Sequence, residues 1–176
     1  MSDHFELLGL PRRYALDLRA LEQAYLLRSR AVHPDFHTTA TPAEQAASLA
    51  LSAALNAAYA TLRDPFRRAD YLLNLYGGPS AEEHKQIPPE FLAEMLECRE
   101  QLEQVRHNPQ ALADLEADFR RRQDQVIEQL AALFAELEKI PDHEPQHLDI
   151  RRRIRMLLNA ARYIQGLLRD LHAPAP

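Results

Sequence analysis

The sequence is short of cysteine, glycine, tryptophan and long apolar runs. Its one cysteine, Cys98, excludes both an intramolecular disulfide and a zinc site built from cysteines. Only four glycines occur in 176 residues, whereas alanine, leucine, glutamate, glutamine and arginine, which favour helices, are abundant. No apolar run approaches the roughly 18 residues of a membrane span, and residues 1–3 do not begin a signal peptide. We therefore expect an all-α protein of the cytoplasm, with no membrane partner.

A basic surface is also missing. The net charge is −5, and residues 1–76 carry as many acidic as basic side chains, so the negative excess falls on residues 77–176. Neither part has the uniformly basic face that is typical of nucleic-acid binders. We expect no nucleic acid among the partners.

Four consecutive residues, Gly77-Gly78-Pro79-Ser80, are the clearest break in the chain, because glycine and proline together interrupt helices. They divide the sequence into two predicted domains, residues 1–76 and residues 80–176. The first contains one short helical segment and three predicted helices: Asp17–Val32, Pro42–Arg63 and a short one over Pro65–Leu75.

Capping residues mark the starts of the two longer helices. Asp17 can accept a backbone N–H in the first turn of one helix, and Thr41-Pro42 is a standard start for the next. Each helix carries apolar residues at helical spacing, which predicts a face turned to the core. These predicted core residues are Leu18, Leu21, Tyr25 and Val32, followed by Leu51, Leu55, Ala58 and Leu62.

The second domain shows a regular, heptad-like apolar spacing in three long segments. Asn108-Pro109 separates the first two segments, and Pro141 and Pro145 bracket the next turn. Three amphipathic helices joined by short turns predict an antiparallel three-helix bundle. Its predicted first stripe is Phe91, Met95, Cys98, Leu102 and Val105.

The tripeptide His33-Pro34-Asp35 lies between the two longer helices of the first domain. Proline bars helical geometry before it, so an imidazole and a carboxylate are held together at a turn. With His37 they could bind a metal, or they could form a catalytic pair, a contact point for another protein or a plain structural turn. No third ligand set, serine elbow or glycine-rich phosphate loop accompanies them, which disfavours a metal-dependent hydrolase.

The residues around this turn resemble a J domain. The resemblance covers Asp3–Leu10, Ala24-Tyr25, Asn56–Pro65 and Arg67–Tyr71, in the order of that family. It implies a helical hairpin whose His-Pro-Asp turn contacts a DnaK-type ATPase chaperone and stimulates ATP hydrolysis there.

Further segments resemble the HscB-type co-chaperones of iron–sulfur cluster assembly. They are Leu8–Asp17, Arg68–Leu73 and, in the second domain, Phe91–Leu102. The resemblance implies an HscA-like ATPase partner that is contacted by His33, Pro34 and Asp35 and, from the preceding helix, by Arg28 and Arg30. The chain departs from the J-domain pattern at Leu26 and Leu27, which occupy positions that are often basic.

A second surface follows from helical phase in the first bundle helix. Leu92 and Leu96 lie about one residue-step outside the predicted core stripe, so they are either exposed or packed at an edge of the bundle. Apolar residues exposed among acidic ones often mark a protein-binding patch. The HscB resemblance implies that this patch binds the scaffold protein IscU. The positions that it implies are Leu92, Ala93, Leu96, Glu97, Glu100, Gln104 and Met156.

We expect a co-chaperone that delivers IscU to an HscA-like ATPase, with no enzymatic activity, cofactor or bound metal of its own. Cys98 is expected in the core, and not as a ligand of the cluster. A general J-domain co-chaperone that serves a broad chaperone is the alternative, and the hydrolase that uses His33, Asp35 and His37 is a more distant one.

Overall fold

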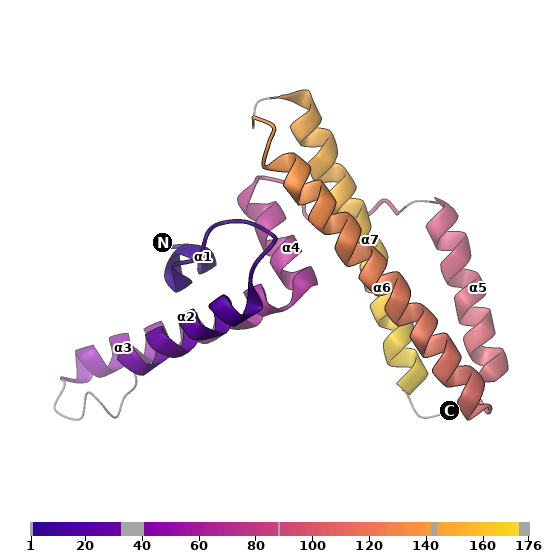
Figure 1. Ribbon diagram of the computed structural model, residues 1–176, viewed down its shortest axis with the longest axis horizontal. Coiled ribbons are helices and arrows are strands. Elements are labelled where there is room, and N and C mark those ends of the chain that lie inside the picture. Colours follow the sequence, from indigo (N-terminus) through magenta and orange to yellow (C-terminus); the bar gives the residue numbers. More distant parts are fainter. Residues whose placement is uncertain (1, 33–40, 88, 142–143, 173–176) are drawn as a thin grey trace. The chain divides into compact units, whose positions relative to one another are not determined.

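The computed structural model describes residues 2–32, 41–87, 89–141 and 144–172, and every regular element in these ranges is an α-helix (Figure 1). The chain divides into two compact units, Met1–Leu72 and Leu73–Pro176. The predicted all-α class is confirmed. The division falls inside helix α4, so a domain boundary at Gly77–Ser80 stays a prediction. Among the described residues, no helix is long and apolar enough to cross a membrane.

The first unit contains helices α1 (His4–Leu8), α2 (Leu18–Ala31) and α3 (Pro42–Arg63), together with most of α4 (Pro65–Leu75). Caps set the helix starts as predicted. The carboxylate of Asp17 accepts the Arg19 N–H at 2.8 Å at the start of α2. At the start of α3, Thr41 forms a reciprocal capping box with Glu44, whose carboxylate accepts the Thr41 N–H at 2.8 Å.

Helices α2 and α3 form an antiparallel hairpin (Figure 1). The Tyr25 ring stacks on Tyr59 with centroids 4.4 Å apart, and its hydroxyl donates to the Asn56 side chain at 2.8 Å. Further along, the Ser48 hydroxyl donates to the Val32 carbonyl oxygen at 2.6 Å. Rising numbers on α2 pair with falling numbers on α3, so the chain reverses direction between them.

Helix α1 covers only one half of this hairpin, and the core lies beneath it. The predicted core faces are confirmed at Leu21 of α2 and at Leu55, Ala58 and Leu62 of α3. They are wrong at Leu18 and Leu51, which are 52% and 40% exposed. None of residues 26–32 and 41–54 is buried, because two helices alone cannot enclose a side chain there. The buried apolar residues of this unit are Phe5, Leu8, Tyr14, Leu21, Leu55, Ala58, Leu62, Ala69 and Leu72.

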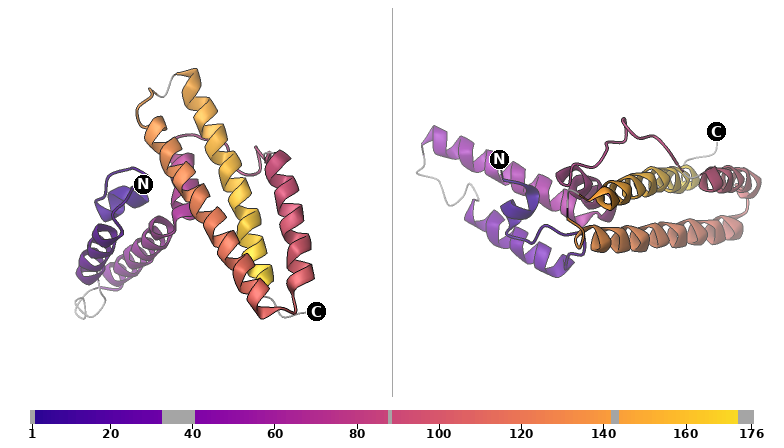
Figure 2. Two further views of the ribbon diagram at one scale, coloured as in Figure 1. Left: turned by 45° about the vertical axis from the view of Figure 1, so that its right-hand side comes forward. Right: turned by 90° about the horizontal axis from the view of Figure 1, so that it is seen from above.

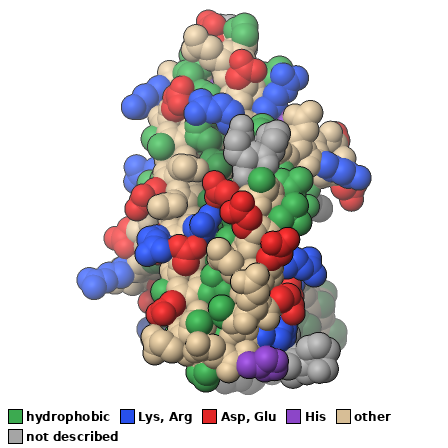
Figure 3. Space-filling model, turned by 90° about the vertical axis from the view of Figure 1, so that its right-hand side faces the viewer, with side chains coloured by type: hydrophobic (Ala, Val, Ile, Leu, Met, Phe, Trp, Pro, Cys, Tyr) green, Lys and Arg blue, Asp and Glu red, His purple; other side chains and the backbone are tan. Residues whose placement is uncertain are grey.

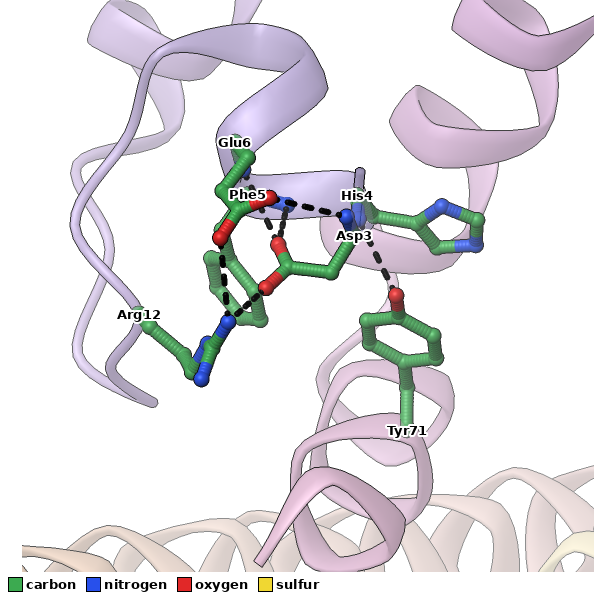
Figure 4. A network of polar contacts seen from close by, with 6 residues as sticks. All are labelled: Asp3, His4, Phe5, Glu6, Arg12 and Tyr71. Atoms are coloured by element: carbon green, nitrogen blue, oxygen red, sulfur yellow. Dashed lines mark hydrogen bonds and ion pairs between the residues drawn. The ribbon is translucent and has the colours of Figure 1, made fainter. Parts of the chain in front are cut away.

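A polar network ties α1 to α4 (Figure 4). Asp3 caps α1 and accepts the Glu6 N–H at 2.9 Å, and Arg12 donates to the carboxylates of both. Burial acts to raise the pKa of Asp3, but these hydrogen bonds hold it below its usual value. His4 stacks on Tyr71 with centroids 4.2 Å apart, and its backbone N–H donates to the Tyr71 hydroxyl at 3.0 Å. Burial lowers the pKa of the His4 imidazole, although the charge of Asp3 opposes that shift.

The second unit is an antiparallel bundle of α5 (Pro89–Val105), α6 (Pro109–Leu137) and α7 (Pro145–His172) (Figure 2). Asn108 caps α6 by accepting the Ala111 N–H at 3.2 Å, ahead of proline in the first turn, as predicted. Helices α6 and α7 supply most of the buried residues. These are Phe119, Val126, Leu130, Leu133, Phe134 and Leu137 from α6, and Ile150, Ile154, Leu158, Ala160, Ala161, Ile164 and Leu167 from α7.

One face of α7 holds the segment that leads from α4 to α5. Arg151 donates to the carbonyl oxygens of Tyr76 and Gly77 at 2.6 and 3.0 Å, and Arg155 donates to that of Pro79 at 2.7 Å. Asn159 follows Arg155 at the same spacing of four residues that separates Arg155 from Arg151. This spacing places all three side chains on one helix face. This row of side chains supplies hydrogen bonds to backbone groups that no helix or sheet satisfies.

Candidate functional site

The tripeptide His33-Pro34-Asp35 lies outside the described residues, as does His37. The described structure shows how the two flanking helices end. Helix α2 closes at Val32, and α3 begins at Pro42. The assigned contact with a chaperone therefore stays a prediction for all three turn residues.

The two arginines assigned to the chaperone contact differ in their surroundings. Both are exposed, but the guanidinium of Arg28 folds back over Gly9, which ends α1 with a φ of +66°. A Cβ at position 9 would overlap this guanidinium, so glycine leaves the room for it. Arg30 is exposed beside Leu26 and Leu27, which are 45% and 73% exposed. The exposed surface of this helix therefore contains leucine as well as arginine.

On α5, the described structure places the predicted scaffold-binding residues on an open face. Leu92 is 42% and Leu96 58% exposed, and their predicted position outside the core stripe is confirmed. The remaining members of this set on α5 are also exposed: Ala93, Glu97, Glu100 and Gln104. Figure 3 shows this side of the molecule, where hydrophobic side chains lie between acidic and basic ones. The role of these residues stays a prediction.

The buried face of α5 fixes the helix to the bundle. Met95, Cys98 and Leu102 are buried, as the predicted stripe requires. Arg122 of α6 donates to the carboxylate of Glu94 at 2.8 Å, which joins α6 to α5 by an ion pair. Burial raises the pKa of the Cys98 thiol, so the thiol stays protonated at neutral pH and is a poor ligand or nucleophile.

A groove runs between α5 and α7, and we call it the α5–α7 groove. It encloses about 240 Å³, and Leu92, Leu96 and Arg99 of α5 line it. Facing them are Arg162, Tyr163 and Gly166 of α7, which the sequence had not singled out. A glycine inside an otherwise strong helical pattern was the available signal.

Met156 does not line this groove. It is half-buried and lines a separate hollow of about 460 Å³ between α6 and α7, with Gln129 and Leu133 among its neighbours. Of the predicted patch, Leu92 and Leu96 therefore line one hollow of the second unit and Met156 lines another.

No group of three or more histidine, cysteine, aspartate or glutamate side chains within the described ranges could hold a metal ion. The candidate ligands His33, Asp35 and His37 are not among those residues, so this result does not bear on them.

Comparison with known proteins agrees with these features. Residues 87–172 match the family model described as the HSCB C-terminal oligomerisation domain. The co-chaperone protein HscB homolog of Bordetella petrii is 39% identical over 136 residues, which cover 77% of this chain and 80% of the relative.

Solved structures of the same kind share the fold. Chaperone HscB from Vibrio cholerae has a TM-score of 0.79 at 28% identity, over 97% of this chain and 96% of that one. The human co-chaperone HscB has a TM-score of 0.83 at 25% identity, over 98% of this chain and 81% of that one. The order of a J domain and a helical bundle is thus shared along almost the whole chain, and the chain belongs to the HscB family of co-chaperones.

Proposed function

We propose that this chain delivers the scaffold protein IscU to an HscA-like, DnaK-type ATPase and stimulates ATP hydrolysis by that chaperone. The observation that carries the proposal is the open apolar pair on α5, Leu92 and Leu96, in the bundle that matches the family model. Apolar side chains that are exposed together among acidic ones often mark a surface that a partner protein covers. We assign the protein to the cytoplasm, with no cofactor and no enzymatic activity of its own.

The first unit engages the ATPase. His33, Pro34 and Asp35 contact the chaperone at the turn, and Arg28 and Arg30 approach it from α2. The chain needs no nucleophile for this role, because a partner that binds one state of the ATPase more tightly shifts the ATPase toward that state. Stimulation is therefore a difference in binding free energy between two chaperone states.

The second unit binds the scaffold protein IscU. Leu92, Ala93 and Leu96 form an apolar centre, and Glu97, Glu100 and Gln104 form its polar rim. This is the usual anatomy of a protein–protein interface, with an apolar centre that excludes water and a polar rim. Met156 makes a further contact with the scaffold from the hollow between α6 and α7.

Affinity capture tests the proposal directly. The purified chain is immobilised, and lysate containing the HscA-like ATPase and IscU is passed over it. Retention of both proteins, together with faster hydrolysis by the purified ATPase, is the expected result. Stimulation of a broad chaperone without any retention of IscU would instead identify a general J-domain co-chaperone.

A further inference from the structure

The α5–α7 groove has an apolar lining that continues from the open pair on α5 across to α7. Leu92 and Leu96 form one wall, and Tyr163, which is 46% exposed, borders the other. An aromatic ring that is half open beside two leucines offers a large contact area at low entropic cost. The apolar surface therefore belongs to two helices and not to α5 alone.

Gly166 keeps this groove open. It lies in the interior of α7, where glycine destabilises a helix relative to alanine. The packing does not require it, because a Cβ built there meets only the end of the Arg169 side chain, at 4.0 Å. Its backbone φ is not in the left-handed region either. Any larger side chain would project into the groove. Glycine at this position therefore leaves the groove unfilled, and the packing of the helix does not require it.

Charge at the groove favours an acidic occupant. Arg99 and Arg162 line it, and neither makes a hydrogen bond or ion pair with any described residue. Asp170 also lines the groove, so two guanidinium groups stand against one carboxylate. Unpaired guanidinium groups beside an apolar hollow suit a carboxylate that carries an apolar neighbour, because arginine binds carboxylates with two parallel hydrogen bonds.

We propose that the α5–α7 groove receives an apolar side chain of the scaffold, with a neighbouring carboxylate of the scaffold at Arg162. Tyr163 and Gly166 are then specificity-determining residues of the same interface. This inference rests on the proposed function, since it assigns the groove to the scaffold protein.

Gly166→Leu is the most discriminating variant. It fills the groove and removes a helix-weakening glycine, so we expect thermal unfolding to shift upward by roughly 2 to 4 °C. We expect the affinity for purified IscU, measured by titration calorimetry, to fall at least about tenfold. A gain of stability with a loss of binding excludes misfolding as the cause.

Two further variants test the ring and the charge. Tyr163→Ala is expected to weaken IscU binding by about tenfold or more, as interface aromatics do. Arg162→Glu is expected to weaken it most at low salt, because the lost attraction is electrostatic. Lys139→Glu makes the same charge change at an exposed position beyond the end of α6 and is expected to leave the affinity unchanged.

Leu96→Ala separates this inference from the proposed function. If Leu96→Ala weakens IscU binding and Gly166→Leu does not, the groove assignment is overturned while the proposed function stands. If neither variant weakens binding, both are overturned. If Gly166→Leu abolishes self-association of the chain and leaves IscU binding intact, the occupant is a second copy and the assignment to the scaffold is wrong.

Discussion

The side-chain amide of Asn159 donates a hydrogen bond to the carbonyl oxygen of His84 at 2.8 Å. The same amide donates to the carbonyl oxygen of Gln86 at 3.1 Å, and Asn159 is almost fully buried. One α7 side chain thus fixes the backbone just before α5, the helix that carries Leu92 and Leu96. The position of the proposed scaffold-binding face depends on this attachment as well as on the apolar core.

Asn159→Ala is expected to destabilise the second unit by about 1 to 3 kcal/mol, because it removes two hydrogen bonds that each contribute about 0.5 to 1.5 kcal/mol. Urea unfolding followed by circular dichroism measures this change. Asn74→Ala, at an exposed position of α4, is the matched control, with an expected change within about 0.5 kcal/mol. Equal effects of the two substitutions would show that the hydrogen bonds of Asn159 contribute nothing.

The stability of the first unit is expected to depend on the protonation of His4. Burial against Tyr71 lowers the pKa of His4, so the unfolded chain binds the proton more tightly than the folded chain. The contribution of His4 to the free energy of unfolding is therefore fully present above the ordinary imidazole pKa of about 6.5. This contribution is lost as the pH falls below that value.

His4→Phe keeps a ring on Tyr71 and removes the titration. We expect its free energy of unfolding to fall less than that of the wild type between pH 7.5 and pH 5.5. His107→Gln, at an exposed position, should retain the wild-type slope. Identical slopes for wild type and His4→Phe would contradict the assignment.

Local signals in the sequence predicted the helices and the orientation of α5. Asp17, Thr41 and Asn108 act as caps where the sequence placed them, because capping depends only on neighbours within three residues. The position of Leu92 and Leu96 outside the core stripe followed from helical phase for the same reason, whereas their exposure did not.

Features that depend on which helix lies opposite could not be predicted. The HscB resemblance named Met156 as part of the patch, but it did not predict the hollow beside α6 that Met156 lines. Tyr163 and Gly166 line the same groove as Leu92 only because of the register of α5 against α7, which many side chains set together. Leu18 and Leu51 had the correct phase for burial, but no third helix among the described residues covers them.

Leu92→Ala combined with Leu96→Ala is expected to weaken IscU binding by about 10- to 100-fold, because both side chains lose apolar area that the partner would cover. Titration calorimetry with purified IscU measures the affinity, and ATPase stimulation without IscU should be unchanged. Leu49→Ala, at a 67% exposed position of α3, removes the same atoms in the other unit. A similar loss of affinity in this control would refute a specific patch on α5.

Arg30→Ala is expected to weaken binding of the ATPase by about two- to fivefold, with the effect fading as salt increases, since Arg30 is exposed on α2. Arg28→Ala should weaken it less, because the Arg28 guanidinium already packs over Gly9. Surface plasmon resonance with the immobilised ATPase compares the two variants. A larger effect of Arg28 would show that its side chain leaves Gly9 to meet the chaperone.

We expect this chain to activate the ATPase of another protein through its His-Pro-Asp turn. The most direct measurement is the rate of ATP hydrolysis by the purified HscA-like ATPase with wild type or with His33→Gln, each with and without IscU. We expect His33→Gln to abolish stimulation while its circular dichroism spectrum and its affinity for IscU match those of the wild type. Undiminished stimulation by His33→Gln would contradict activation of the ATPase through this turn.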